Sequence, residues 1–140
     1  MSDSKKLLIV EDDADVRLGY QVLLKANSYE TFFAVDSMAA VSEARKHQPD
    51  LIILDLGLPA GDGFIVLDRF RANINLALIP VVVVSGRDIH GNRDRALSAG
   101  ARAFVQKPWN DSELLGIIAN VLGQVPTSFS PGASGYFPVA

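Results

Sequence analysis

Short apolar runs alternate along the chain with segments in which apolar residues recur every three or four positions. Short, mostly continuous apolar runs are typical of strands that are covered on both faces of a sheet. Three such runs, at residues 6–10, 51–54 and 80–84, are therefore predicted to be strands. Two more mixed segments, at residues 29–35 and 103–106, are predicted to be strands as well.

The segments between the strands have helical periodicity, which places their apolar side chains on one face of each helix. The residues expected to form these faces are Val16, Tyr20, Leu23 and Leu24, then Met38, Val41 and Ala44, then Phe64, Leu67 and Phe70, and finally Leu114, Ile117, Ile118 and Val121. Asp13 and Asn110 are expected to cap the first and last helices, because such side chains accept hydrogen bonds from free backbone N–H groups. Residues 87–100 contain few apolar side chains, so a helix there is expected to bury little and to have low local stability.

Five strands that alternate with helices indicate an α/β fold with a parallel sheet and helices on both faces. The first, third and fourth strands are the most apolar and suit the centre, whereas the second and fifth suit the edges. This pattern matches the doubly wound, flavodoxin-like strand order 2-1-3-4-5. In such sheets, ligands bind beyond the carboxyl ends of the strands, near the point where the chain reverses direction.

Composition restricts the chemistry that this fold can carry. The chain has 140 residues, which suits one domain. Cysteine is absent, which excludes disulfides, thiolate nucleophiles, iron–sulfur clusters and the usual zinc sites. The net charge of −3, from 13 basic and 16 acidic side chains, does not suit a nucleic-acid-binding protein. No signal peptide or membrane-spanning run is seen, so a cytoplasmic protein with no direct contact to nucleic acid or membrane is expected.

Polar side chains follow four of the predicted strands. Glu11 and Asp12 follow the first strand, Asp55 the third, Ser85 the fourth and Lys107 the fifth. These side chains should converge at one rim of a parallel sheet. Carboxylates in one crevice repel each other unless a hard divalent cation with oxygen ligands joins them. Magnesium fits best, because it takes one or two carboxylates and keeps waters that a phosphate can replace.

A carboxylate, a divalent cation, an ammonium and a hydroxyl together have the parts for phosphoryl transfer. Asp55 would be the nucleophile, since carboxylates can form aspartyl phosphates. Ser85 and Lys107 would bind the phosphoryl oxygens. Each of these residues alone is more often a cap, a turn residue or a solvated side chain. Their joint occurrence at the strand ends is what favours a phosphoryl-transfer site.

Four motifs occur in the order of one known family. They are an acidic pair after the first strand, D-x-x-L-P-x-x-D-G from Asp55, a hydroxyl ending the fourth strand, and K-P ending the fifth. In this combination the chain resembles the receiver domain of two-component response regulators, the family that includes the bacterial chemotaxis regulator. The resemblance covers residues 6–122. It implies a receiver domain at 1–122, followed by a flexible, uncharged tail or truncated linker at 123–140. The protein would be either a stand-alone receiver or a piece of a longer regulator or hybrid kinase.

The resemblance also implies a role for each site residue. Asp55 would be the phosphoacceptor of a signalling switch that is not a turnover enzyme. A Mg²⁺ or Mn²⁺ site would be formed by Glu11, Asp12, Asp55 and the backbone carbonyl of Gly57, with Asp13 as the alternative to Asp12. Ser85, Lys107 and Phe104 would bind the phosphoryl group or respond to it as switch residues. Arg87 would tune the lifetime of the phosphoryl group. Phe104 has no hydroxyl, so any switching there would work by packing alone. The bond before Pro108 is expected to be cis, as is typical of the family.

The expected partners are a sensor histidine kinase or a histidine phosphotransfer protein, and a downstream protein that the sequence does not identify. The oligomeric state is expected to be a monomer or a phosphorylation-dependent dimer. One alternative is a pseudo-receiver that binds proteins without being phosphorylated. A haloacid-dehalogenase-type phosphatase needs a second acid where Gly57 stands. A dinucleotide- or flavin-binding domain needs a glycine-rich turn where Glu11, Asp12 and Asp13 stand.

Overall fold

Strands and helices alternate through the protein as its apolar pattern predicts. The structure, a computed structural model, describes residues 4–58, 63–86 and 89–124. The strands are β1 (Lys6–Val10), β2 (Glu30–Ala34), β3 (Leu51–Leu54), β4 (Val81–Ser85) and β5 (Ala103–Gln106). The helices are α1 (Ala14–Ala26), α2 (Ser37–His47), α3 (Gly63–Ala72), α4 (Ile89–Ser98) and α5 (Asp111–Val121).

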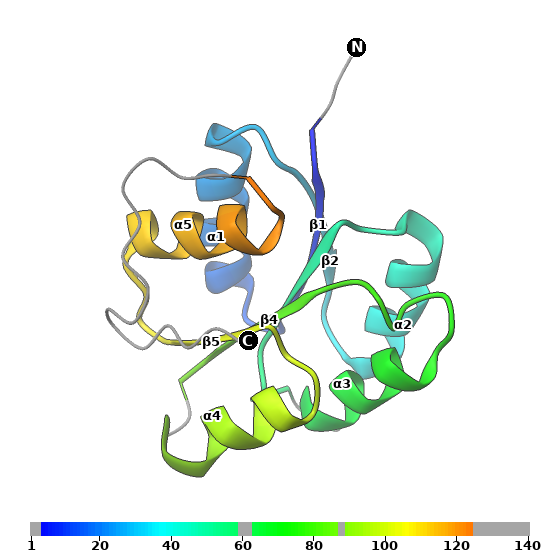
Figure 1. Ribbon diagram of the computed structural model, residues 1–140. Helices are drawn as coiled ribbons and strands as arrows, with labels where there is room; N and C mark the ends of the chain where they lie inside the picture. The colour runs from blue at the N-terminus through cyan, green and yellow to red at the C-terminus, as the bar shows by residue number, and fades with distance from the viewer. Residues whose placement is uncertain (1–3, 59–62, 87–88, 125–140) are drawn as a thin grey trace.

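The strands form one parallel sheet in the order β2-β1-β3-β4-β5. The flavodoxin-like order predicted from the sequence is therefore confirmed, and the mixed strands β2 and β5 lie at the edges. Figure 1 shows α1 and α5 on one face of the sheet and α2, α3 and α4 on the other. In the register between β1 and β3, Val10 lies opposite Leu54. The residues that follow these two strands therefore begin side by side.

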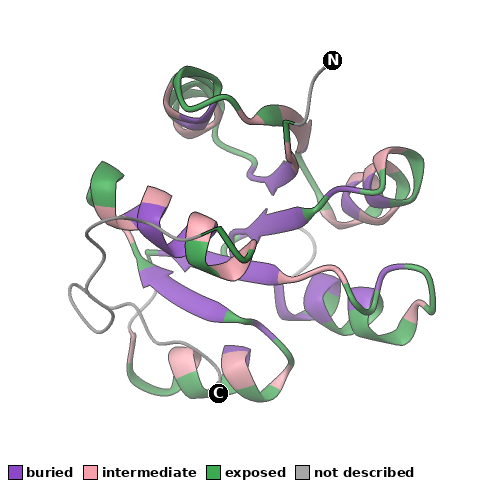
Figure 2. Ribbon diagram, turned by 45° about the horizontal axis from the view of Figure 1, so that its top comes forward, coloured by how far each residue is buried: buried purple, intermediate pink, exposed green. Residues whose placement is uncertain are grey.

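Each face of the sheet has its own apolar core, because successive strand side chains point to opposite faces. Leu8 and Val10 belong to the cluster beneath α2, α3 and α4, whereas Leu7 and Ile9 belong to the cluster beneath α1 and α5. Figure 2 shows the buried residues on the strands and on the inward sides of the helices. This explains why the central strands have continuous apolar runs instead of apolar residues at alternate positions.

Three expectations from the apolar pattern differ from the structure. Strand β2 spans Glu30–Ala34 and is one residue shorter at each end than the predicted segment 29–35. Strand β4 begins at Val81 and not at Pro80, because proline has no N–H to donate to the ladder; the Pro80 carbonyl still accepts from the Ile52 N–H. Met38 does not face the core: 79% of its surface is exposed, and Ala40 and Ala44 form the buried face of α2 instead. Small alanine side chains lie against the sheet here. A search for periodicity that gives most weight to large apolar residues does not detect such a face.

Helix α4 has the smallest apolar face of the described helices. Ala96 is its one buried residue, and Ile89 and Leu97 are partly buried against the core. The backbone angles of His90 and Gly91 are not helical, with φ of +80° at Gly91, so the regular helix begins after this kink. The low local stability expected for this segment stays a prediction.

Helix α5 ends at Val121, and the described chain continues slightly beyond the domain boundary expected at residue 122. Gln124 donates its N–H to the carbonyl of Ala119, and its side chain accepts a hydrogen bond from the Tyr29 hydroxyl at 3.0 Å. The rest of the expected tail, from residue 125 onward, lies outside the described residues.

Gly63 is the last glycine of the D-x-x-L-P-x-x-D-G motif, and the packing requires it. A Cβ at this position would lie 2.6 Å from the Asp55 carbonyl oxygen and 2.5 Å from the Leu56 Cα. We expect Gly63→Ala to destabilise the protein by about 1–3 kcal/mol, the usual cost of overpacking. The control is Gly19→Ala within α1, where a Cβ would meet nothing within 4 Å, so about 0.5–1 kcal/mol of stabilisation is expected. Urea denaturation measures both, and a Gly63→Ala variant as stable as the wild type would contradict the packing argument.

Candidate functional site

Acidic side chains from two adjacent strand ends gather at one rim of the sheet. Glu11 and Asp12 follow β1, and Asp55 follows β3; an oxygen of each lies within 4.8 Å of the others. The Asp55 N–H donates to the Val10 carbonyl, and the Glu11 N–H donates to the Ala34 carbonyl, so the strand ladders extend into the site. Glu11 is 2% exposed and Asp55 is 9% exposed, whereas Asp12 is open to solvent.

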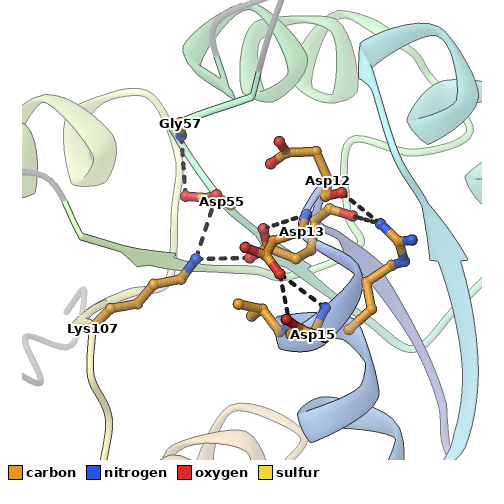
Figure 3. Close-up of polar contacts among 9 residues, drawn as sticks. Asp12, Asp13, Asp15, Asp55, Gly57 and Lys107 are labelled. Carbon is orange, nitrogen blue, oxygen red and sulfur yellow. Dashed lines mark hydrogen bonds and ion pairs between the residues drawn. The ribbon is translucent and has the colours of Figure 1, made fainter.

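Lys107 brings a positive charge to these acids from the end of β5. Its Nζ lies 2.7 Å from Glu11 Oε1 and 3.4 Å from Asp55 Oδ2. Figure 3 shows the Asp55 carboxylate between Lys107 and the backbone of Gly57, whose N–H donates to Asp55 Oδ1 at 3.0 Å. The Lys107 N–H donates to the Ser85 carbonyl, and the Lys107–Pro108 bond is cis, as predicted. One ammonium therefore serves two buried carboxylates.

The pKa values show that this charge balance is incomplete. Burial raises the pKa of Glu11 above its ordinary 4.5, and the charge of Asp55 raises it further; the hydrogen bond from Lys107 offsets this only in part. Burial by itself would lower the pKa of Lys107, but its hydrogen bond to Glu11 and the charge of Asp55 outweigh burial and raise it. The ammonium of Lys107 is thus stabilised, whereas the charged form of Glu11 remains less favourable than in water.

A pH-dependent stability follows from the raised pKa of Glu11. The folded protein holds the Glu11 proton to a higher pH than the unfolded chain does, so stability contributed by that proton is lost as pH rises. The loss begins near pH 4.5 and is complete above the raised pKa of the folded state. We expect urea denaturation without divalent cations to show this decline in the wild type and in Glu30→Gln, an exposed control, but not in Glu11→Gln. Equal pH slopes in all three proteins would contradict it.

Asp13 occupies a different place from the other two acids of its run. Its side chain accepts from the N–H groups of Asp15 and Val16 at 2.8 and 3.1 Å and so caps α1, as expected. Its own N–H donates to Glu11 Oε2 at 3.2 Å. The carboxylate of Asp13 is committed to the helix, which leaves Asp12 as the member of the acidic cluster.

The other predicted residues occupy the rim or the core nearby. Ser85 ends β4 and is fully buried, and Phe104 is fully buried on the face of the sheet that α2, α3 and α4 cover. Gly57 is exposed, and a Cβ there would lie 3.6 Å from Asp55 Oδ1, so its lack of a side chain leaves this carboxylate open. Arg87 lies outside the described residues.

A family model confirms what the motifs and this geometry indicate. The model of the response regulator receiver domain matches residues 7–119. The chain belongs to this family. It is therefore a receiver domain and not a turnover enzyme, and the phosphatase and dinucleotide-binding alternatives do not apply.

Relatives of this receiver domain include longer proteins. The transcriptional regulatory protein PrrA of Mycobacterium tuberculosis is 35% identical over 130 residues, which are 91% of this chain and 55% of PrrA. The response regulator PleD of Caulobacter vibrioides is 37% identical over 109 residues, which are 77% of this chain and 24% of PleD. The chain thus spans about half, or less, of the length of these curated relatives.

Solved structures of receiver domains share the fold over most of this chain. A putative response regulator from Chloroflexus aurantiacus has a TM-score of 0.82 at 27% identity, covering 87% of this chain and 100% of its own. The receiver domain of a sensor histidine kinase from Pseudomonas aeruginosa has a TM-score of 0.79 at 26% identity, covering 86% of this chain and 99% of its own. That structure contains a magnesium ion coordinated in the active site cleft.

The receiver domain also contains an aromatic pair at the edge of the site. The ring of Trp109, directly after Pro108, stacks on the ring of Tyr20 with centroids 4.5 Å apart. Trp109 lines a cleft of about 550 Å³ together with Val16, Gly19, Lys107, Pro108 and Asp111. Burial raises the pKa of Tyr20 well above 10.0, and the charges of Glu11 and Asp55 add to this. Periodicity placed Tyr20 in the core but could not show that it lies close to the acidic side chains.

Within the described residues, no helix is long and apolar enough to cross a membrane.

Proposed function

We propose that this receiver domain accepts a phosphoryl group on Asp55 in a Mg²⁺-dependent reaction and thereby changes the surface that it offers to a partner. The observation that carries the proposal is the cluster of three carboxylates from two strand ends, with the Lys107 ammonium 3.4 Å from Asp55 Oδ2. Glu11 and Asp55 each have one oxygen beside this ammonium and the other bonded to a backbone N–H, but Asp55 is the more accessible of the two, at 9% exposed against 2% for Glu11.

The donor set suits a magnesium ion. The carboxylates supply hard oxygen ligands, and a bound divalent cation would offset the burial and the Asp55 charge that raise the pKa of Glu11. Asp12 and Asp55 would be direct ligands, with Glu11 and the Gly57 carbonyl completing the protein's share; manganese has similar preferences. When bound, the cation would neutralise charge on the transferring phosphoryl group. The magnesium ion in the Pseudomonas aeruginosa relative supports this assignment.

The transfer itself needs an open carboxylate oxygen and fixed positive charge. An oxygen of Asp55 attacks the phosphorus of a phosphohistidine, on a sensor histidine kinase or a phosphotransfer protein. The new O–P bond forms as the P–N bond breaks, and the electron pair of that bond returns to the histidine ring of the donor. Lys107 and the hydroxyl of Ser85 would bind the phosphoryl oxygens. Gly57 places no side chain over Asp55, so the donor can approach.

The added charge would act on the elements that surround Ser85 and Phe104. Phe104 is already fully buried and has no hydroxyl, so a change there would work through packing against α4. Helix α4 buries little, which makes it the element that a new charge at Asp55 could shift with least energy. Arg87 precedes α4 and would influence how long the phosphoryl group persists. The downstream partner and any phosphorylation-dependent dimer would use this altered face.

Incubation with acetyl phosphate tests the proposed function without a kinase. In the presence of Mg²⁺, intact-mass measurement should show the addition of one phosphoryl group, and chelation of the metal with EDTA should prevent it. A protein that stays unmodified with Mg²⁺ at all acetyl phosphate concentrations would contradict the proposal. That outcome would favour the pseudo-receiver, which binds proteins without being phosphorylated.

A further inference from the structure

Arg17 contacts the backbone of both acidic residues that follow β1. Its Nη1 donates to the carbonyl oxygen of Glu11 at 3.0 Å and to that of Asp12 at 2.8 Å. Arg17 itself lies in the first turns of α1, where its N–H donates to the Asp13 carbonyl. One guanidinium nitrogen therefore holds two consecutive carbonyl groups of the turn between β1 and α1.

The carboxylate of Asp12 depends on this backbone for its position. Across residues 4–58, 63–86 and 89–124, no hydrogen bond to that carboxylate is found, although Glu11 and Asp55 each have partners. The side chain of Asp12 is exposed, so packing does not fix it either. The backbone of Glu11 is held in the sheet through the Ala34 carbonyl, and that of Asp13 through the cap of α1. Among the residues that the structure describes, Arg17 is the side chain that holds the peptide between them.

We infer that Arg17 is a positioning residue, which holds the turn so that Asp12 presents its carboxylate beside Asp55 for the divalent cation. The inference rests on the proposed function, since it concerns the same metal site. A guanidinium suits this task because it stays protonated and its rigid, planar donors can serve adjacent acceptors. Arg17 faces the carbonyl side of the turn and does not touch the carboxylates, so it leaves their oxygens available for the metal.

A purely electrostatic role and a positioning role of Arg17 predict opposite changes in Mg²⁺ affinity when its side chain is removed. A positive charge near a metal site repels the cation, so on electrostatic grounds alone its removal would strengthen Mg²⁺ binding. Loss of a group that orients ligands weakens metal binding, commonly by about 10–100-fold. The sign of the change in Mg²⁺ affinity therefore separates a positioning role from a simple contribution of charge.

Isothermal titration with Mg²⁺ tests the inference on the full chain. We expect the dissociation constant of Arg17→Gln to rise by about tenfold or more, and that of Arg17→Lys, which keeps the charge, to rise less. Lys25→Gln removes the same charge from the last turn of α1, away from the acidic turn, and should leave the affinity within about twofold of wild type. Mg²⁺ binding by Arg17→Gln that is as tight as in the wild type, or tighter, would overturn the inference.

Two further measurements keep the result interpretable. If Arg17→Gln is less stable, the Mg²⁺ affinity can be obtained from the stability that added Mg²⁺ contributes in urea denaturation, which is independent of the starting stability. The rate of phosphorylation by acetyl phosphate should return close to wild type at saturating Mg²⁺, because Arg17 does not contact the reacting groups. Asp12→Ala is measured in parallel. Wild-type Mg²⁺ affinity in Asp12→Ala would contradict the proposed metal site. Reduced Mg²⁺ affinity in Asp12→Ala with unchanged affinity in Arg17→Gln would contradict only the role of Arg17.

Discussion

Asp55→Asn is expected to abolish incorporation of the phosphoryl group from acetyl phosphate. The amide has nearly the shape of the carboxylate, and its oxygen can still accept the N–H of Gly57, so the local fold should persist. It carries no negative charge, however, and is not a nucleophile toward phosphorus. The ion pair between Asp55 Oδ2 and Lys107 is also lost. The expected effect is therefore complete loss of labelling in a folded protein.

Intact-mass measurement after incubation with acetyl phosphate and Mg²⁺ checks this expectation. Asp68→Asn is the matched control, because Asp68 is an exposed acid on α3 and should be labelled like the wild type. Urea denaturation should show that Asp55→Asn is folded, since removal of the Asp55 charge also relieves its repulsion of Glu11. Undiminished labelling of Asp55→Asn would mean that another side chain is the acceptor.

Asp12→Ala is expected to reduce Mg²⁺ affinity on the order of 100-fold while leaving the stability of the metal-free protein nearly unchanged. Asp12 is exposed and has a carboxylate oxygen within 4.8 Å of oxygens from Glu11 and Asp55. Loss of one unit charge about 4 Å from a cation forfeits several kcal/mol at an effective dielectric constant near 20, of which hydration recovers a part. Without the metal, removal of this charge also reduces repulsion within the cluster.

Asp13→Ala provides the opposite control for this experiment. Asp13 caps α1, so its loss should destabilise the protein by about 1 kcal/mol. It should have much less effect on Mg²⁺ affinity, because the Asp13 carboxylate is not part of the acidic cluster. Calorimetric Mg²⁺ titration and urea denaturation of both variants measure this reversal. If Asp13→Ala lost more Mg²⁺ affinity than Asp12→Ala, the assignment of these two acids would be wrong.

Much of the architecture could be predicted because parallel strands buried on both faces have a strong apolar signature. The bounds of β1, β3 and β5 agree with the predicted strands, and the mixed strands β2 and β5 lie at the edges as predicted. The α2 helix shows where this signal fails. Its large apolar residue, Met38, is exposed, and two alanines face the sheet, because the helix packs through its smallest side chains.

The convergence of Glu11, Asp12, Asp55 and Lys107 could also be predicted, because the carboxyl ends of parallel strands meet at one rim. The way in which Lys107 divides its charge between Glu11 and Asp55 could not be predicted. Its ammonium lies closer to Glu11 than to Asp55, and this depends on burial and on distances that spacing in the sequence does not contain. The same holds for the stack of Tyr20 on Trp109, which joins residues 89 positions apart in the chain (109 − 20).

The sequence by itself thus determined the fold class, the strand order and the identity of the acidic site. Apolar runs specify which strands are covered on both faces, and the residues that follow those strands must lie at the rim where the strands end. Only the tertiary structure decided which groups hold those residues in place. Arg17 fixes the peptides of Glu11 and Asp12, and Gly63 allows α3 to approach the backbone of Asp55. Both roles depend on a close approach between helix and strand ends, which arises only once these elements have packed.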